Sequence, residues 1–224
     1  MNIWIKICGN TTLKDALLAV DAGADALGFV FAPSPRRVTA EQVAAIVPHL
    51  PETIEKIGVF VDAPLEEIVS TVQACGLTGV QLHFDADPEL PTRLHERLGP
   101  KLRILRVMHF GAEFAENHAA QIAEHAKNPH VDAVLVDSRT ATAVGGTGVT
   151  FEWAEARKTV FRDAGELKRI AAGGLNPDNV AEAIAALRPW GVDVASGVEA
   201  APGRKDAAKM REFVRRARMA TAAW

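Results

Sequence analysis

The sequence predicts an α/β protein, a single-domain (β/α)8 TIM barrel that spans residues 1–224. Three observations predict this fold. Strand-like and helix-like segments alternate eight times, most strand-like segments are nearly continuous apolar runs, and no linker or low-complexity segment separates the units. The competing fold is a doubly wound open sheet. That fold usually has fewer strands, and no G-x-G-x-x-G motif follows the first strand here.

The first strand is expected at residues 4–9, and the rest of the chain is organised around it. Its isoleucines alternate with Trp4, Lys6 and Cys8. One face is therefore aliphatic, whereas the other carries a lysine and then a thiol. The thiol lies at the carboxyl end of the strand, where parallel barrels gather their chemistry.

The remaining strands are short apolar runs bounded by turn-forming residues. They are expected at residues 26–31, 57–61, 79–83, 103–107, 133–137, 167–172 and 191–195. Helices are expected from apolar residues at three- and four-residue spacing. They cover residues 13–20, 39–50, 62–72, 87–98, 113–127, a stretch near Trp153, 176–187 and 206–224.

Three of these helices carry recognisable start signals. Thr39 and Gln42 fit a capping box, in which each side chain bonds to the backbone of the other residue. Asp87-Pro88 is expected to open the fourth helix. Asn176-Pro177 is expected to supply a cap and a first-turn proline for the seventh.

Composition excludes several classes of function. A net charge of −3 gives no electrostatic footprint for nucleic acid or for an acidic membrane. The two cysteines, Cys8 and Cys75, form no disulfide framework or metal-ligand cluster. No signal peptide or membrane span is evident. We therefore expect a cytoplasmic monomer or homodimer that acts on a small molecule, with no nucleic-acid or membrane partner.

Two side chains are candidates for proton transfer. Cys8 ends the first strand and Asp137 ends the sixth, on the rim where barrel enzymes place their active sites. Lys6 shares a face with Cys8 and would favour a thiolate, which acts as a base or a nucleophile. Apolar neighbours would favour a protonated Asp137, a candidate acid. The structural alternatives are a small buried hydrophobe for Cys8 and a turn residue for Asp137.

Glycine-rich loops predict a phosphate site. Gly173-Gly174 follows the seventh strand, and Ser196-Gly197 follows the eighth, before an expected short helix. Barrel enzymes often bind phosphate through backbone N–H groups of these two loops, where a Cβ would block close approach. The alternative is that these glycines only make turns. A third loop at residues 140–148 contains Gly146 and would cover the substrate or serve only as a connection.

Several charged and polar residues complete the candidate pocket. Arg36 and Arg37 follow the second strand and would bind a substrate carboxylate, unless they form a solvated surface pair. On the fourth strand, Gln81 and His83 share the inward face. Lys6 and Asp193 are expected to form a structural ion pair inside the barrel.

Together these motifs resemble the phosphoribosylanthranilate isomerase family. The resemblance rests on Lys6-Ile7-Cys8-Gly9, Ser34-Pro35-Arg36, Gly58-Val59-Phe60-Val61, Val80-Gln81-Leu82-His83, Val136-Asp137-Ser138, Gly145-Gly146-Thr147-Gly148, Ala172-Gly173-Gly174-Leu175-Asn176-Pro177 and Asp193-Val194-Ala195-Ser196-Gly197-Val198-Glu199. The motifs run in the family's order, so the resemblance covers essentially the whole chain.

The resemblance implies a (β/α)8 barrel of tryptophan biosynthesis that uses no cofactor or metal. It implies an Amadori rearrangement of N-(5-phosphoribosyl)anthranilate, with Asp137 as general acid and Cys8 as general base. The family's carboxylate-binding arginine falls on Arg36. Because the loop after the second strand is one residue shorter than in many relatives, Arg37 is the alternative.

Three other functions compete with this one. The related isomerase of histidine biosynthesis performs the same rearrangement on another aminoribosyl phosphate. Its family characteristically has an aspartate where Cys8 stands here, which argues against it. A bifunctional enzyme would accept both substrates. A barrel that only binds or scaffolds would have no need for Cys8, Asp137 and the glycine loops together.

Overall fold

The structure is a computed structural model that describes residues 2–83, 87–110, 118–137, 153–161 and 167–221. Within these residues, no helix combines the length and apolar composition that a bilayer span requires. Eight parallel strands form a closed barrel in sequence order, which confirms the predicted fold. They are β1 (Trp4–Ile7), β2 (Ala26–Val30), β3 (Glu55–Val61), β4 (Gly79–His83), β5 (Arg103–His109), β6 (Ala133–Asp137), β7 (Lys168–Ala172) and β8 (Gly191–Val194).

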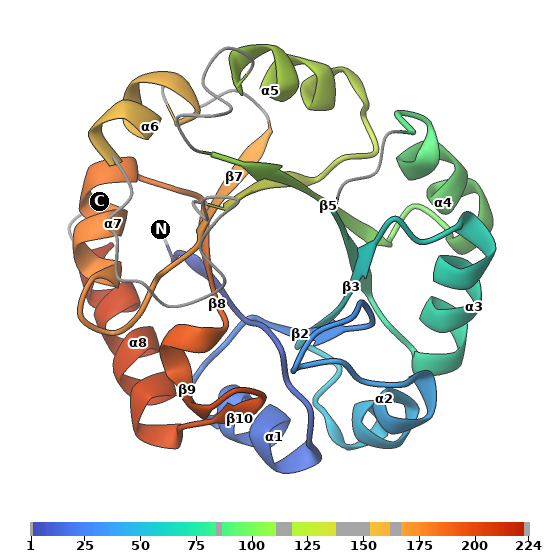
Figure 1. Ribbon diagram of the computed structural model, residues 1–224, viewed down its shortest axis with the longest axis horizontal. Helices are drawn as coiled ribbons and strands as arrows, with labels where there is room; N and C mark the ends of the chain where they lie inside the picture. Colours follow the sequence, from blue (N-terminus) through green and yellow to red (C-terminus); the bar gives the residue numbers. More distant parts are fainter. Residues whose placement is uncertain (1, 84–86, 111–117, 138–152, 162–166, 222–224) are drawn as a thin grey trace.

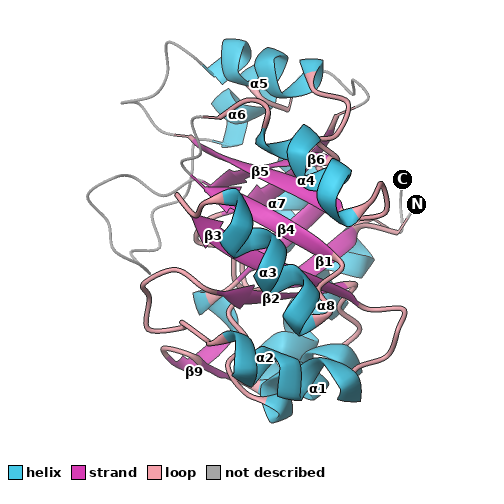
Figure 2. Cartoon of the chain, turned by 90° about the vertical axis from the view of Figure 1, so that its right-hand side faces the viewer, coloured by secondary structure: helices cyan, strands magenta, loops and turns pink. Residues whose placement is uncertain are grey.

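Helices surround the strands on all sides (Figure 1), and a side view shows the same two layers (Figure 2). They are α1 (Leu13–Asp21), α2 (Ala40–Ile46), the 3-10 turn η1 (Val47–His49), α3 (Leu65–Cys75), α4 (Leu90–Leu98), α5 (His118–Lys127), α6 (Trp153–Thr159), α7 (Val180–Leu187) and α8 (Ala207–Ala220). The aliphatic face of β1, formed by Ile3, Ile5 and Ile7, packs into the cluster between barrel and helices as its alternation predicts.

The inside of the barrel changes character along its axis. At the amino end of the strands Trp4 stacks on Trp190, with 5.2 Å between ring centroids. Trp4 is part of a second apolar cluster, against which Trp190 packs and which also includes Ile57, Leu105 and Ile170. At the carboxyl end the buried side chains become polar; they include Lys6, Gln81, His83, Asp137 and Asp193. Because burial of polar groups requires partners, this end of the barrel is where a site is expected.

Three predicted helix starts are too early. The third helix is expected from residue 62, and α3 begins at Leu65. The Asp87 carboxylate accepts from the Glu89 backbone, and α4 begins only at Leu90. Asn176 Oδ1 accepts from the backbone N–H groups of Asp178 and Asn179, and α7 begins at Val180. At α4 and α7 the side chain stabilises a turn before the helix instead of its first turn. The capping box at Thr39 and Gln42 is confirmed.

Strand limits also differ slightly. β3 begins two residues before the predicted position, β5 continues to His109, and β1 ends at Ile7 so that Cys8 directly follows it. The expected short helix after β8 is present as the 3-10 turn η3 (Ser196–Val198). It leads into an unpredicted hairpin of β9 (Glu199–Ala201) and β10 (Arg204–Lys205). Expected helix residues 113–117 and the loop at 140–148 lie outside the described residues.

Candidate active site

Cys8 lies at the carboxyl end of β1, between β2 and β8. Its backbone N–H donates to the Val194 carbonyl at 2.8 Å, and its side chain leans over Gly28 of β2. A Cβ on Gly28 would come within 2.6 Å of the Cys8 Sγ, so glycine at this position makes the room that the thiol occupies. The structure therefore places Cys8 on the predicted rim, buried but at the mouth of the barrel.

A chain of buried hydrogen bonds crosses the barrel beside Cys8. Lys6 Nζ donates to Asp193 Oδ1 at 2.7 Å and to Gln81 Oε1 at 2.9 Å. Gln81 Nε2 in turn lies 2.9 Å from His83 Nε2. The predicted ion pair and the shared face of Gln81 and His83 are thereby confirmed.

The direction of these hydrogen bonds assigns the state of His83. A lysine only donates, so the Gln81 atom that contacts Lys6 is its oxygen, and the amide nitrogen is the donor toward His83. His83 Nε2 is therefore the acceptor and carries no proton. The imidazole is the neutral tautomer with its proton on Nδ1, fixed by a lysine two side chains away.

Lys6 is fully buried, and its charge is maintained by two neighbours. Burial lowers the pKa of Lys6, but the negative charges of Asp193 and of a Cys8 thiolate outweigh it and raise the pKa above 10.5. The ammonium group of Lys6 therefore lies beside the Cys8 side chain, on the face of β1 where the sequence predicts both residues.

Asp137 is the last residue of β6 and is 3% exposed. Its backbone carbonyl accepts from the Phe110 N–H at 2.9 Å. Strands β7 and β8 lie between β6 and β1, and all are parallel, so Asp137 and Cys8 end on the same rim. Residues 138–152, which include Gly146, lie outside the described part of the chain.

The two glycine loops expected to bind phosphate touch one another. Gly173 and Gly174 have φ values of 83° and 64°, which favour glycine. A Cβ on Gly197 would lie 1.9 Å from the Leu175 carbonyl oxygen. Gly197 thus allows the loop after β8 to pack on the loop after β7, while Gly174 and Ser196 remain exposed beside this contact.

The structure separates the roles of Arg36 and Arg37. Arg36 forms a two-pronged ion pair with Glu199, through Nε to Oε1 at 2.7 Å and Nη2 to Oε2 at 2.6 Å. Arg37 is exposed, and its guanidinium has no hydrogen bond or ion pair with any residue in the described ranges. The arginine favoured by the sequence is thus already engaged by a carboxylate of the chain itself.

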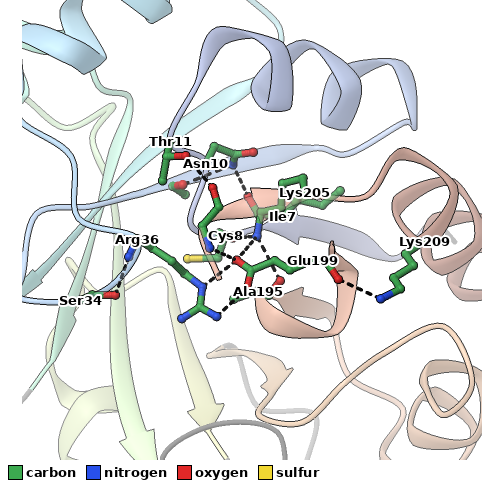
Figure 3. Close-up of polar contacts among 12 residues, drawn as sticks. Ile7, Cys8, Asn10, Thr11, Ser34, Arg36, Ala195, Glu199, Lys205 and Lys209 are labelled. Carbon is green, nitrogen blue, oxygen red and sulfur yellow. Dashed lines mark hydrogen bonds and ion pairs between the residues drawn. The ribbon is translucent and has the colours of Figure 1, made fainter. Parts of the chain in front are cut away.

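Glu199 and Lys205 lie beside the candidate site, and neither is among the candidate residues that the sequence indicates. Both are buried, and both belong to the β9–β10 hairpin that packs against the end of β1 (Figure 3). Their signal in the sequence is weak, because Arg204-Lys205-Asp206 reads as a solvated lead into the last helix. Only the hairpin turns Lys205 inward.

Comparison with known proteins assigns the chain to one family. Residues 5–216 match the family model of N-(5'-phosphoribosyl)anthranilate isomerase. An enzyme of that name from Pelobacter propionicus is 48% identical over 214 residues, which is 95% of this chain and 94% of the relative.

Solved structures of the same family agree. Phosphoribosylanthranilate isomerase from Thermotoga maritima is 34% identical with a TM-score of 0.81, over 96% of this chain and 98% of that one. A phosphoribosylanthranilate isomerase in complex with reduced 1-(o-carboxyphenylamino)-1-deoxyribulose 5-phosphate is 33% identical with a TM-score of 0.79, over the same shares.

Glu199 gives the stability a defined pH dependence. Burial raises the pKa of Glu199, but hydrogen bonds from Arg36 and the charge of Lys205 outweigh it and lower the pKa below 4.5. A carboxyl group with a depressed pKa stabilises the fold above its unfolded value, and this contribution is lost as the pH falls through the folded value. Glu199→Gln should therefore cost about 3 kcal/mol at pH 7, with a difference from wild type that shrinks below pH 4.5.

Urea unfolding between pH 7 and pH 3 measures this difference. Glu124→Gln is the matched control, because Glu124 forms an exposed ion pair with Lys127 and should contribute little. A Glu199→Gln deficit that stays constant down to pH 3 would contradict the role of the charge.

Proposed function

The chain belongs to the N-(5'-phosphoribosyl)anthranilate isomerase family, and we propose that Cys8 is the general base and Asp137 the general acid of its reaction. The enzyme converts N-(5'-phosphoribosyl)anthranilate to 1-(2-carboxyphenylamino)-1-deoxy-D-ribulose 5-phosphate in tryptophan biosynthesis. This is an Amadori rearrangement, an internal transfer of hydrogen from C2 to C1 of the sugar.

The reaction needs one acid and one base on different sides of the sugar. Asp137 donates a proton to the ring oxygen, and the furanose opens to a Schiff base. Cys8 takes the proton from C2 and leaves an enolamine, which tautomerises to the ketone. The observation that carries this assignment is the position of Cys8 on the rim beside the buried ammonium group of Lys6.

We propose that the substrate phosphate binds at the loops that contain Gly173, Gly174, Ser196 and Gly197. Contact between the loops supports this site, because it brings backbone from the ends of β7 and β8 together. Backbone N–H groups in such loops suit an anion, and glycine leaves room for its close approach.

For the anthranilate carboxylate we propose Arg37 in place of Arg36. A guanidinium binds a carboxylate best through two parallel hydrogen bonds. Arg36 already makes two such bonds with Glu199, and Glu199 is buried. Arg37 is exposed and follows the same strand, so its guanidinium can bind substrate without breaking an internal ion pair.

The setting of the enzyme follows from the same proposals. Both cysteines are free and buried, which fits a reducing compartment, and we propose that the enzyme acts in the cytoplasm as a monomer or homodimer. The aspartate-based isomerase of histidine biosynthesis is disfavoured by Cys8, and turnover of its substrate would reveal a bifunctional enzyme.

The acid–base assignment predicts the behaviour of two near-isosteric variants. Cys8→Ser removes an accessible anion, and Asp137→Asn removes the proton donor. Each should lower kcat by roughly 10²–10⁴-fold, while the fold and phosphate binding persist. Loss of phosphoribosylanthranilate fluorescence measures the rate, and kcat/KM should be bell-shaped against pH. Near-wild-type kcat in either folded variant would remove that residue from the mechanism.

Arg37→Ala should weaken binding of the product by roughly 10–150-fold, the equivalent of about 1.5–3 kcal/mol for hydrogen bonds to a charged group. A product analogue that lacks the carboxyl group, 1-phenylamino-1-deoxyribulose 5-phosphate, should bind both proteins equally. Titration calorimetry measures all four affinities. If Arg36→Ala shows this selective loss and Arg37→Ala does not, Arg36 is the carboxylate ligand.

Gly174→Ala tests the phosphate site. No described heavy atom lies within 4 Å of a Cβ at Gly174, so the strain comes from its φ of +64°. Gly76, at the end of α3, also has a φ of +64°, and a Cβ there would lie 3.6 Å from the Val47 side chain, which is an ordinary contact distance. Gly76→Ala is therefore a matched control. Both variants should lose about 1 kcal/mol of stability.

Only Gly174→Ala should bind inorganic phosphate more weakly, by roughly tenfold or more. Competition of phosphate with substrate measures this affinity. Equal phosphate inhibition of Gly174→Ala and Gly76→Ala would place the phosphate elsewhere. Gly197 is unsuitable as a probe, because any side chain there collides with the Leu175 carbonyl.

A further inference from the structure

Behind Cys8, three charged side chains converge from distant parts of the chain (Figure 3). Glu199 lies between two cations: it pairs with Arg36 on one side and with Lys205 on the other, at 3.2 Å from Nζ to Oε1. The Lys205 side chain is 0% exposed, and that of Glu199 is 5% exposed. The mechanism of the reaction as derived above uses neither residue.

Lys205 is an ammonium group by its hydrogen bonds. Its Nζ donates to three acceptors: the carbonyl of Cys8, the carbonyl of Ala195 at 3.0 Å and Glu199 Oε1. A neutral amine has two N–H donors, whereas an ammonium has three. Three acceptors around one buried nitrogen therefore require the charged form. Burial lowers the pKa of Lys205 below its ordinary value, and the charges of Glu199 and Cys8 oppose this shift in part.

Two of these acceptors are backbone carbonyls at the seam of the barrel, where the first strand β1 pairs with the last strand β8. Cys8 follows β1 and Ala195 follows β8, and these strands pair with Lys6 opposite Asp193. Beyond Cys8, the N–H of Gly9 donates to the Gly28 carbonyl at 3.0 Å. The peptide groups on both sides of Cys8 are thus bonded to neighbouring strands, and Lys205 binds the carbonyl of Cys8 itself. This fixes the point from which the thiol projects.

The same cluster places cations beside the thiol. Within the described residues, Lys6 of β1 and Lys205 of the hairpin both interact with the charge of Cys8. Each is paired with a carboxylate, Asp193 of β8 and Glu199 of the hairpin, and Arg36 of the loop after β2 shares Glu199. The buried Asp137 carboxyl group ends β6 on the same rim. Lys205 is thus a buried cation whose charge acts on the Cys8 side chain.

We propose that Lys205 is a positioning residue for the base Cys8, fixing its backbone through the Cys8 carbonyl and placing an ammonium group beside its thiol, with Glu199 holding Lys205 in place. The proposal rests on the assignment of Cys8 as base. It predicts an effect on the thiol itself, which is measurable without substrate.

Lys205→Met is the direct test, because methionine keeps the length of the side chain and removes its charge. Two readouts report the thiolate: the rate of Cys8 alkylation by iodoacetamide at pH 7, with peptide mapping to separate Cys8 from Cys75, and the acid limb of the kcat/KM profile. Alkylation should slow and the acid limb should move to higher pH. The kcat should fall by about 10–100-fold, the scale of a misplaced catalytic group, with a smaller change in KM.

Lys209→Met is the matched control. Lys209 Nζ donates to the Glu199 carbonyl at 2.8 Å and joins the same hairpin to α8, but it makes no contact with Cys8 in the described structure. This variant should alter stability and leave both thiolate readouts at wild-type values. A purely structural role of the cluster would make the two lysine variants behave alike.

Glu199→Gln tests the support of Lys205. It keeps the shape of the side chain but removes the charge that raises the pKa of Lys205 and holds its ammonium group. Alkylation should therefore slow and the acid limb should move to higher pH, by less than in Lys205→Met, whereas the Lys209→Met control stays at wild-type values. If Lys205→Met does not fold, Glu199→Gln decides, and an unchanged or faster alkylation rate in it overturns the proposal.

Failure of the role proposed for Lys205 can be distinguished from failure of the assignment of Cys8 as the base. A folded Lys205→Met protein with wild-type alkylation and a wild-type acid limb overturns the role of Lys205 alone. Retained activity of Cys8→Ser overturns the assignment of the base, whatever the lysine variants show.

Discussion

The pairing of β1 with β8 closes the barrel, and the site depends on this seam. In its register Lys6 stands opposite Asp193, so the first and last strands meet at a buried ion pair. A buried lysine charge without an oppositely charged partner would strongly destabilise the fold, so the pair restricts which strand can lie beside β1. Cys8 and Ala195, the residues that follow, are then brought to a single ammonium group.

From this seam the polar order of the barrel mouth follows step by step. Lys6 donates in two directions, which fixes the orientation of the Gln81 amide and then the tautomer of His83. None of these groups is free to reorient without leaving a buried donor or acceptor unpaired. The site is therefore preorganised, with directions of hydrogen bonding set before substrate arrives.

A second consequence concerns the use of charge. The buried cations at this end of the molecule are paired with carboxylates of the chain, Lys6 with Asp193, and both Lys205 and Arg36 with Glu199. Glu199 alone therefore joins the hairpin cation to the two-pronged contact of Arg36.

The sequence by itself determined the barrel, its strands and the rim on which Cys8 and Asp137 end, because these follow from local alternation and from the parallel topology that eight repeated units impose. It also indicated the Lys6–Asp193 pair, because charged side chains that are buried inside a closed barrel need oppositely charged partners. Only the tertiary structure decided that Arg36 is bound by Glu199, which lies 163 residues away, and that Lys205 turns inward behind Cys8. The starts of α4 and α7 were also decided there. Arg36 and Lys205 reach their partners only because segments that are distant in the chain pack together, and no local pattern contains such a contact. The Asp87 and Asn176 side chains instead stabilise turns that precede their helices.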